Sequence, residues 1–123
     1  MNKTDSKLYA RTNFYCSDVQ RSITFYVEKL GFEKKWDYKN GEKILSAQVD
    51  RNSCELMLTH FSNVISGGGG LYISLHKREQ LQSFYEEFKD KGVLFETEIH
   101  RTYWNSTEFS VLDPDGNRIV FSG

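Results

Sequence analysis

The feature that most constrains this 123-residue chain is one order of secondary structure that occurs twice. In the first half, the pattern predicts a strand over residues 8–16, a helix over 18–30 and three further strands within 32–58. The same order restarts at residue 71 with a strand, followed by a helix over residues 77–91. The repeat therefore predicts two βαβββ modules in an α+β protein.

The two predicted helices carry matching landmarks. Residues 17–20 have the form of a capping box at the start of the first helix, and a glycine, Gly31 or Gly92, follows each helix. Apolar residues recur in both helices at spacings of three and four residues, which places them on one helical face. They are Val19, Ile23, Tyr26 and Leu30 in the first helix and Leu81, Phe84, Tyr85 and Phe88 in the second.

The last two strands are predicted to form a hairpin around residues 113–117. Pro114 presets φ for a turn, Gly116 accepts a positive φ, and Asp113 and Asn117 can bond their own backbone. A tight turn here joins the two strands that end the chain.

A strand pattern with a period of two follows the first helix. Phe32, Lys34, Trp36 and Tyr38 are expected to point to one side of this strand and the intervening residues to the other. The Asn-Gly pair at residues 40–41 then supplies a hairpin turn to the next strand.

The composition is that of one domain, residues 1–123, with 38% hydrophobic and 15% aromatic residues to form a core. The 16 basic and 17 acidic residues give a net charge of −1, so we expect neither nucleic acid nor an anionic membrane as a partner. The N-terminus is polar, so we expect no export signal, and no apolar run approaches a membrane span. We therefore expect a cytoplasmic protein in which the two cysteines are reduced.

Several short motifs accompany this order of elements. They are the helix that opens at Ser17-Asp18 and ends at Leu30-Gly31-Phe32, the segment 55–58, Trp104, Glu108-Phe109 and the turn 113–117. With these motifs the chain resembles the vicinal oxygen chelate superfamily. That superfamily includes glyoxalases, extradiol dioxygenases, fosfomycin-resistance thiol transferases and bleomycin-resistance proteins, and the chain most resembles the bleomycin-resistance-like branch.

The resemblance covers residues 8–121 and implies a specific architecture. Two tandem βαβββ modules, residues 8–60 and 71–122, are expected to form a curved mixed sheet with a ligand cleft. In bleomycin-resistance proteins two chains pair so that clefts form at the dimer interface, so a homodimer is expected. The glycine-rich residues 67–70 between the modules are either a flexible linker or a loop that closes over a ligand.

The resemblance also identifies where the enzymes of the superfamily bind their metal ion. The position of the first ligand is occupied by Arg11, which cannot be a metal ligand, and that of the last glutamate by Val120. The strand that opens the second module lacks a histidine, and His76 lies at its wrong end. Only Glu55 matches a ligand position, so we expect no metal, no cofactor and no catalytic residue.

The remaining candidates are aromatic and polar side chains on or beside strands. Large flat rings give stacking surfaces and carboxylates attract cations, so such residues suit a flat or cationic ligand. The predicted ligand-binding residues are Trp36, Tyr38, Glu55, His60, Tyr103, Trp104 and Glu108. The alternatives are that the aromatic residues merely cover a sheet face, and that Glu108 is solvated or paired with Arg101 or Arg118.

These observations favour a metal-free protein that sequesters a small molecule, such as a bleomycin-type antibiotic, in a cleft at the dimer interface. Two alternatives stay open. One is a metal-dependent glyoxalase, dioxygenase or thiol transferase, and the other is a non-catalytic dimerisation scaffold. The sequence leans against an enzyme and leaves the identity of the ligand open.

Overall fold

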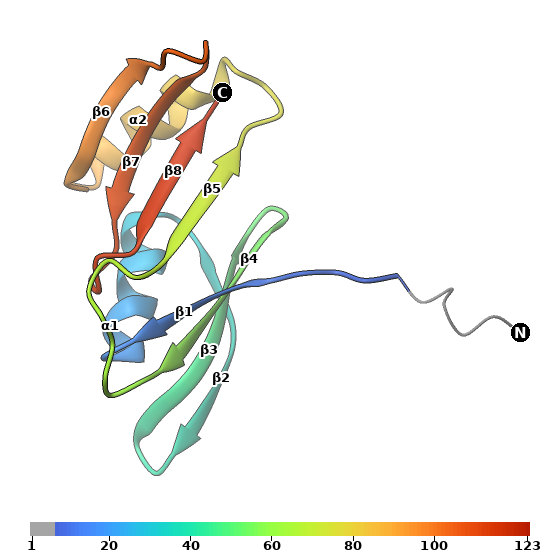
Figure 1. The fold of residues 1–123 in the computed structure, drawn as a ribbon. Helices are drawn as coiled ribbons and strands as arrows, with labels where there is room; N and C mark the ends of the chain where they lie inside the picture. Colours follow the sequence, from blue (N-terminus) through green and yellow to red (C-terminus); the bar gives the residue numbers. More distant parts are fainter. Residues whose placement is uncertain (1–6) are drawn as a thin grey trace, which may run out of the picture.

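The computed structural model describes residues 7–123, and it contains the predicted order of elements twice (Figure 1). Residues 1–6, on which the expectation about an export signal partly depended, lie outside the described residues. The first module consists of β1 (Thr12–Cys16), α1 (Val19–Thr24), η2 (Phe25–Lys29), β2 (Glu33–Asn40), β3 (Lys43–Arg51) and β4 (Cys54–His60). The second consists of β5 (Gly70–Ser74), α2 (Gln80–Asp90), β6 (Phe95–Arg101), β7 (Thr107–Leu112) and β8 (Arg118–Ser122).

Each module forms its own four-stranded mixed sheet. The strand orders are β1-β4-β3-β2 and β5-β8-β7-β6, and in each sheet the first strand is parallel to its neighbour while the other pairs are antiparallel. The helix of each module covers one face of its sheet; α2 lies behind the second sheet in Figure 1. The predicted α+β fold of two βαβββ modules is confirmed.

The first helix differs from the prediction at its start and in its second half. Asp18, rather than Ser17, is the N-cap, because its carboxylate accepts a hydrogen bond from the Arg21 backbone N–H at 3.1 Å. From Phe25 to Lys29 the helix widens into a π-helix. The apolar face is nevertheless buried as predicted, because Tyr26 within the π-helix and Leu30 directly after it are both fully covered.

The core contains the apolar faces of both helices. In the second module it is largely aromatic: the rings of Phe109 and Phe121 stack with centroids 5.0 Å apart, and Phe88 and Tyr85 contact Phe109 edge-on. Each such pair adds about 0.5–1.5 kcal/mol beyond the burial of its area. This core therefore fixes how α2 sits on its sheet.

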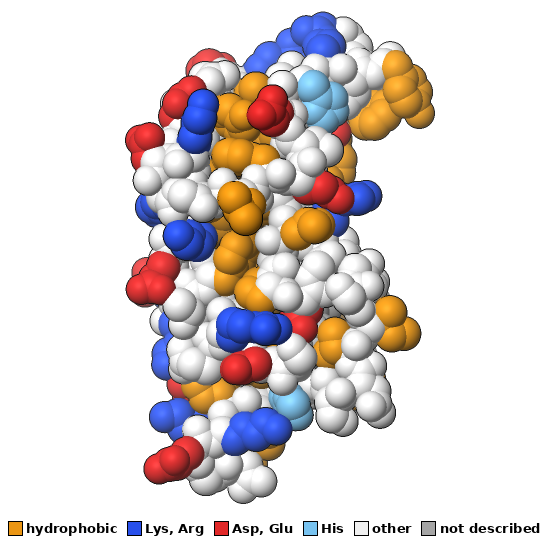
Figure 2. Space-filling view, turned by 90° about the vertical axis from the view of Figure 1, so that its left-hand side faces the viewer, with side chains coloured by type: hydrophobic (Ala, Val, Ile, Leu, Met, Phe, Trp, Pro, Cys, Tyr) orange, Lys and Arg blue, Asp and Glu red, His pale blue; other side chains and the backbone are white. Residues whose placement is uncertain are grey.

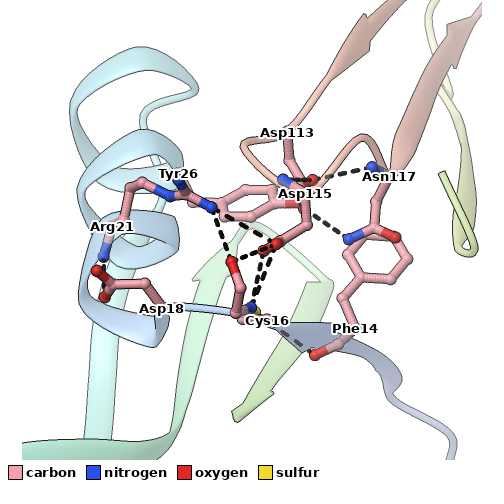
Figure 3. Close-up of polar contacts among 9 residues, drawn as sticks. Phe14, Cys16, Asp18, Arg21, Tyr26, Asp113, Asp115 and Asn117 are labelled. Carbon is pink, nitrogen blue, oxygen red and sulfur yellow. Dashed lines mark hydrogen bonds and ion pairs between the residues drawn. The ribbon is translucent and has the colours of Figure 1, made fainter. Parts of the chain in front are cut away.

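The turn at residues 113–117 also joins the two modules, as Figure 3 shows. The Tyr26 hydroxyl of η2 donates a 2.8 Å hydrogen bond to the Asp113 carboxylate, which also accepts the backbone N–H groups of Asp115 and Asn117. Ser17 donates its hydroxyl to Asp115 at 2.6 Å. The hairpin turn of the second module therefore fixes the start and the middle of the first module's helix.

A second connection between the modules is made by Arg51 at the end of β3. Its guanidinium donates to both carboxylate oxygens of Glu87 on α2, at 2.6 and 2.8 Å, and to the Leu30 carbonyl at 2.7 Å. The same group lies 4.6 Å from the centre of the Phe84 ring. Arg51 lowers the pKa of Glu87, as expected for a paired carboxylate.

The glycine-rich segment lies against the first module. A side chain at Gly69 would meet the Asn117 side chain at 2.6 Å and the Phe14 ring at 2.8 Å, so only a glycine fits there.

Figure 2 shows a band of hydrophobic side chains that runs between Lys, Arg, Asp and Glu side chains from the second module to the first. Within residues 7–123, no helix is long and apolar enough to cross a membrane.

Candidate functional site

The outer face of the first sheet, the side away from α1, carries a group of polar and aromatic side chains. Alternation along β3 directs Ala47 and Val49 into the core, where both are fully buried, and directs Gln48 to the opposite side. Gln48 is nevertheless only 7% exposed, because other side chains surround it. A buried amide on an outer face requires hydrogen-bond partners.

Gln48 has four partners. Its carbonyl oxygen accepts from Arg11 Nη1 at 2.8 Å and from Trp36 Nε1 at 3.3 Å. Its amide nitrogen donates to Asp50 Oδ1 at 2.9 Å and to Glu55 Oε1 at 3.2 Å. We refer to Arg11, Trp36, Gln48, Asp50 and Glu55 as the Gln48 cluster.

The cluster combines an aromatic ring with an excess of negative charge. Two carboxylates and one guanidinium leave a formal charge of −1, and Trp36 is 38% exposed at the sheet surface. Tyr9 adds a second ring, since its hydroxyl donates to Glu55 at 3.1 Å and Arg11 lies 5.8 Å from its ring centre. The arrangement can stack a flat group and attract a positive one.

A β-bulge places the aromatic residues of β2 on this face. Lys34 pairs with Val49 and Trp36 pairs with Gln48, so Lys35 is an extra residue in β2. The side chains after it therefore point to the opposite side of the sheet from the one that the alternation before it predicts. The prediction that Phe32, Lys34, Trp36 and Tyr38 share one side is therefore wrong. Phe32 is buried among the core residues, whereas Trp36 and Tyr38 lie on the outer face.

Glu108 lies on the corresponding face of the second sheet. It is only 6% exposed, and it accepts hydrogen bonds from the hydroxyls of Tyr72 and Ser106, the latter at 3.0 Å. Neither sequence alternative for Glu108 is correct, because it is neither solvated nor paired with an arginine. Arg118 instead donates to Glu96 at 2.6 and 2.7 Å, which lowers the pKa of Glu96.

The other three predicted ligand-binding residues lie apart from the Gln48 cluster. His60, at the end of β4, contacts Lys43 Nζ through Nε2 at 3.1 Å, and its Nδ1 is buried without a partner among the described residues. Tyr103 and Trp104 lie on the loop between β6 and β7, with their rings edge to face at 4.6 Å. Tyr103 is 96% exposed. Of the predicted residues, Trp36 and Glu55 thus meet at Gln48, and Tyr38 shares their face of the sheet.

A hollow of about 380 Å³ adjoins the cluster where the turn between β3 and β4 meets β5. Phe32, Phe84 and Phe121 supply apolar lining, and polar groups of Ser53 and Gln80 lie among them. Glu55 lines this hollow as well as belonging to the Gln48 cluster. The two features are therefore continuous at Glu55.

Comparison with known proteins gives the family. Residues 9–121 match the model of the glyoxalase/bleomycin resistance protein/dioxygenase superfamily. The chain belongs to this superfamily. The bleomycin resistance proteins of Geobacillus stearothermophilus and Staphylococcus aureus are 26% identical to it over 119 residues, spanning 85% of this chain and 87% of theirs.

Solved structures of the superfamily share the fold. The bleomycin-binding protein of Streptomyces verticillus, complexed with copper(II)-bleomycin, matches with a TM-score of 0.76 and 22% identity, over 94% of this chain and 95% of that one. The lactoylglutathione lyase of Agrobacterium tumefaciens matches with a TM-score of 0.75 and 15% identity, over 95% and 93% of the two chains. Binding proteins and an enzyme thus share this fold.

Within this superfamily member, Arg11 and Glu55 have roles other than the metal ligation that the resemblance suggested for their positions. Arg11 donates to Gln48, and Glu55 accepts from Gln48 and Tyr9. Across residues 7–123, no group of three or more His, Cys, Asp or Glu side chains could hold a metal ion together. The candidate site is therefore best described by hydrogen bonding and stacking.

Gln48, Asp50, Arg11 and Tyr9 were not among the predicted ligand-binding residues. Gln48 lies between two buried residues of β3, Ala47 and Val49, but β3 also contains Ser46 and Asp50, so its polarity alone does not single it out in the sequence. Its partners come from three other regions of the chain. Their convergence follows from the sheet order, which the sequence does not show directly.

Proposed function

We propose that this protein binds and sequesters a flat, cationic, antibiotic-like small molecule on the outer face of its first sheet. The observation that carries the proposal is the Gln48 cluster, in which the Trp36 ring and two carboxylates share one buried amide. The names of the relatives agree with this function, since they include bleomycin resistance proteins and a bleomycin-binding protein.

The chemistry of the cluster suits binding without conversion of the ligand. Its hydrogen bonds consume both lone-pair directions of the Gln48 oxygen and both hydrogens of its amide nitrogen. Neither cysteine is a nucleophile, because burial raises the pKa of Cys16 to about 11 and also raises that of Cys54. The surface therefore offers contacts rather than a reacting group.

A homodimer forms part of the proposal. The outer face of the first sheet exposes Trp36 and Tyr38, while Trp104 is half exposed on the second module. We infer that the second module of one copy faces the first sheet of the other, so that a bound molecule lies between them. In this arrangement Glu108, His60, Tyr103 and Trp104 reach the ligand from the partner or from the rim.

Calorimetric titration of the metal-stripped protein with metal-free bleomycin tests the proposal. We expect saturable heat near one ligand per chain that does not depend on added divalent metal. Mass spectrometry of the recovered bleomycin should show no change in its mass. Binding only after metal addition, or a modified product, would favour an enzyme, and no heat in either state would favour a scaffold.

A further inference from the structure

Gln48 is the only residue of the Gln48 cluster that contacts all the others. Trp36 and Arg11 bind its oxygen, and Asp50 and Glu55 bind its nitrogen. None of these four side chains forms a hydrogen bond to another of the four. Their mutual placement therefore depends on the amide at the centre.

The two ends of the Gln48 amide bind different kinds of group. The carbonyl oxygen faces two N–H donors, and the amide nitrogen faces two carboxylates, so this orientation satisfies all four groups whereas the flipped one satisfies none. Gln48 is 7% exposed, so water cannot easily replace these partners. The orientation of the side chain is thereby fixed.

We propose that Gln48 is the positioning residue that makes this face selective for a planar ring bearing a nearby positive charge. The proposal rests on the proposed function. Trp36 Nε1 and Glu55 Oε1 lie 3.3 and 3.2 Å from the two ends of one amide. They are therefore no more than about 9 Å apart, a span set by two hydrogen bonds and one amide group.

This spacing defines the class of ligand. A ring stacked on Trp36 places a cationic substituent within reach of Glu55 and Asp50 when the two groups belong to one rigid molecule. An uncharged ring of the same size gains the stacking contact alone. An anionic ring meets the net negative charge of the cluster and is rejected.

The variant Gln48→Met tests this role. Methionine is similar in length and volume, so the site stays filled while all four hydrogen bonds are lost. The control is Ser46→Ala, two residues away on the same face of β3 and opposite Tyr38. The probes are proflavine, a planar three-ring cation, and acridone, an uncharged molecule with the same ring system.

We expect wild type and Ser46→Ala to bind proflavine more tightly than acridone. In Gln48→Met the proflavine affinity should fall by about tenfold and the acridone affinity by less than about threefold, since the carboxylates are no longer held beside the ring. Equal affinities of wild type and Gln48→Met for proflavine would overturn the proposal while leaving the proposed function intact. A wild type that binds neither proflavine nor bleomycin would overturn both.

A spectroscopic measurement without ligand gives a second test. The chain has two tryptophans, so a nitrogen-15 spectrum shows two indole N–H signals, which Trp104→Phe assigns. The Trp36 signal should shift in Gln48→Met, which lacks the acceptor, and stay near its wild-type position in Gln48→Glu, which keeps an acceptor oxygen. A Trp36 indole signal whose position changes in neither variant would contradict the positioning role.

Discussion

At the scale of single residues, Trp36 is the side chain on which the binding proposal depends most. It reaches the outer face only because of the bulge after Lys34, and its indole is held by Gln48. Its partial exposure means that folding depends little on it, whereas a stacked ligand would use its whole ring.

We predict that Trp36→Ala weakens metal-free bleomycin binding by about tenfold or more, as expected for an aromatic contact at the centre of a binding surface. The urea midpoint should change little, because the residue lies on an edge strand. Leu94→Ala, at a residue that is exposed elsewhere, serves as the control for removal of a large side chain. Loss of folding with unchanged affinity per folded molecule would assign Trp36 a structural role.

We predict that the buried thiol of Cys16 makes the free energy of unfolding depend on pH in the alkaline range. Burial raises the pKa of its thiol to about 11, so the thiolate forms first in the unfolded chain, where the thiol is unperturbed. The unfolded state then binds fewer protons than the folded state, and the free energy of unfolding falls as pH rises from about 9 to about 11.

The fall due to Cys16 should approach about 1.4 kcal/mol per pH unit within this window. Cys16→Ala should show a shallower decline, whatever its stability at neutral pH. Urea unfolding at several pH values measures both slopes. Parallel declines for the two proteins would show that Cys16 is not protected by burial.

At the scale of elements, the turn at residues 113–117 carries the strictest local requirement. Gly116 has a φ of +81°, and a side chain there would lie 2.7 Å from Ser66 Oγ and 2.9 Å from the Gly67 backbone nitrogen. Gly41 also has a positive φ, +65°, but nothing lies within 4 Å of the position of its missing side chain. Substitutions at the two glycines therefore distinguish the cost of backbone strain alone from the cost of strain together with a steric clash.

We predict that Gly116→Ala lowers the free energy of unfolding by at least about 2 kcal/mol, and Gly41→Ala by only about 1 kcal/mol. The difference reflects the clash with the segment that precedes β5. Chemical denaturation of both variants gives the comparison. Equal losses would mean that this segment moves freely away from the turn.

The elements also show what the sequence could and could not predict. Helix faces were predictable because Val19, Ile23 and their counterparts recur at a helical period, and burial follows that period. The faces of β2 were not, because the bulge after Lys34 depends on pairing with β3 and leaves no mark in the alternation. The cap at Asp18 was displaced by one residue because Ser17 is bound to Asp115, far along the chain.

At the scale of the whole molecule, the contacts between the modules include the turn at residues 113–117, the ion pair of Arg51 with Glu87 and a hydrogen bond from Lys29 Nζ to the Lys91 carbonyl. The fold could be predicted from the repeat because each module is specified locally. The candidate site could be predicted only in part, since Gln48 gathers side chains from three regions of the chain besides its own strand. Long-range polar convergence of this kind has no short-range sequence pattern.

We predict that Tyr26→Phe lowers the free energy of unfolding by about 1–3 kcal/mol, because it leaves the buried Asp113 carboxylate without one of its donors. Tyr15→Phe is the control, since Tyr15 is exposed and its hydroxyl bonds to no other residue in the described part of the chain. Urea unfolding measures both. A loss in Tyr26→Phe no greater than that in Tyr15→Phe would show that the hydrogen bond from Tyr26 to the turn does not stabilise the contact between the modules.

The proposed function requires that a small molecule binds to the outer face of the first sheet. The most direct test is titration of nitrogen-15-labelled protein with metal-free bleomycin, followed through assigned backbone and indole signals. We expect the Trp36 indole and the backbone of Gln48 and Glu55 to shift most, in a saturable manner. Shifts confined to α1 and α2, or no shifts at millimolar bleomycin, would contradict the claim.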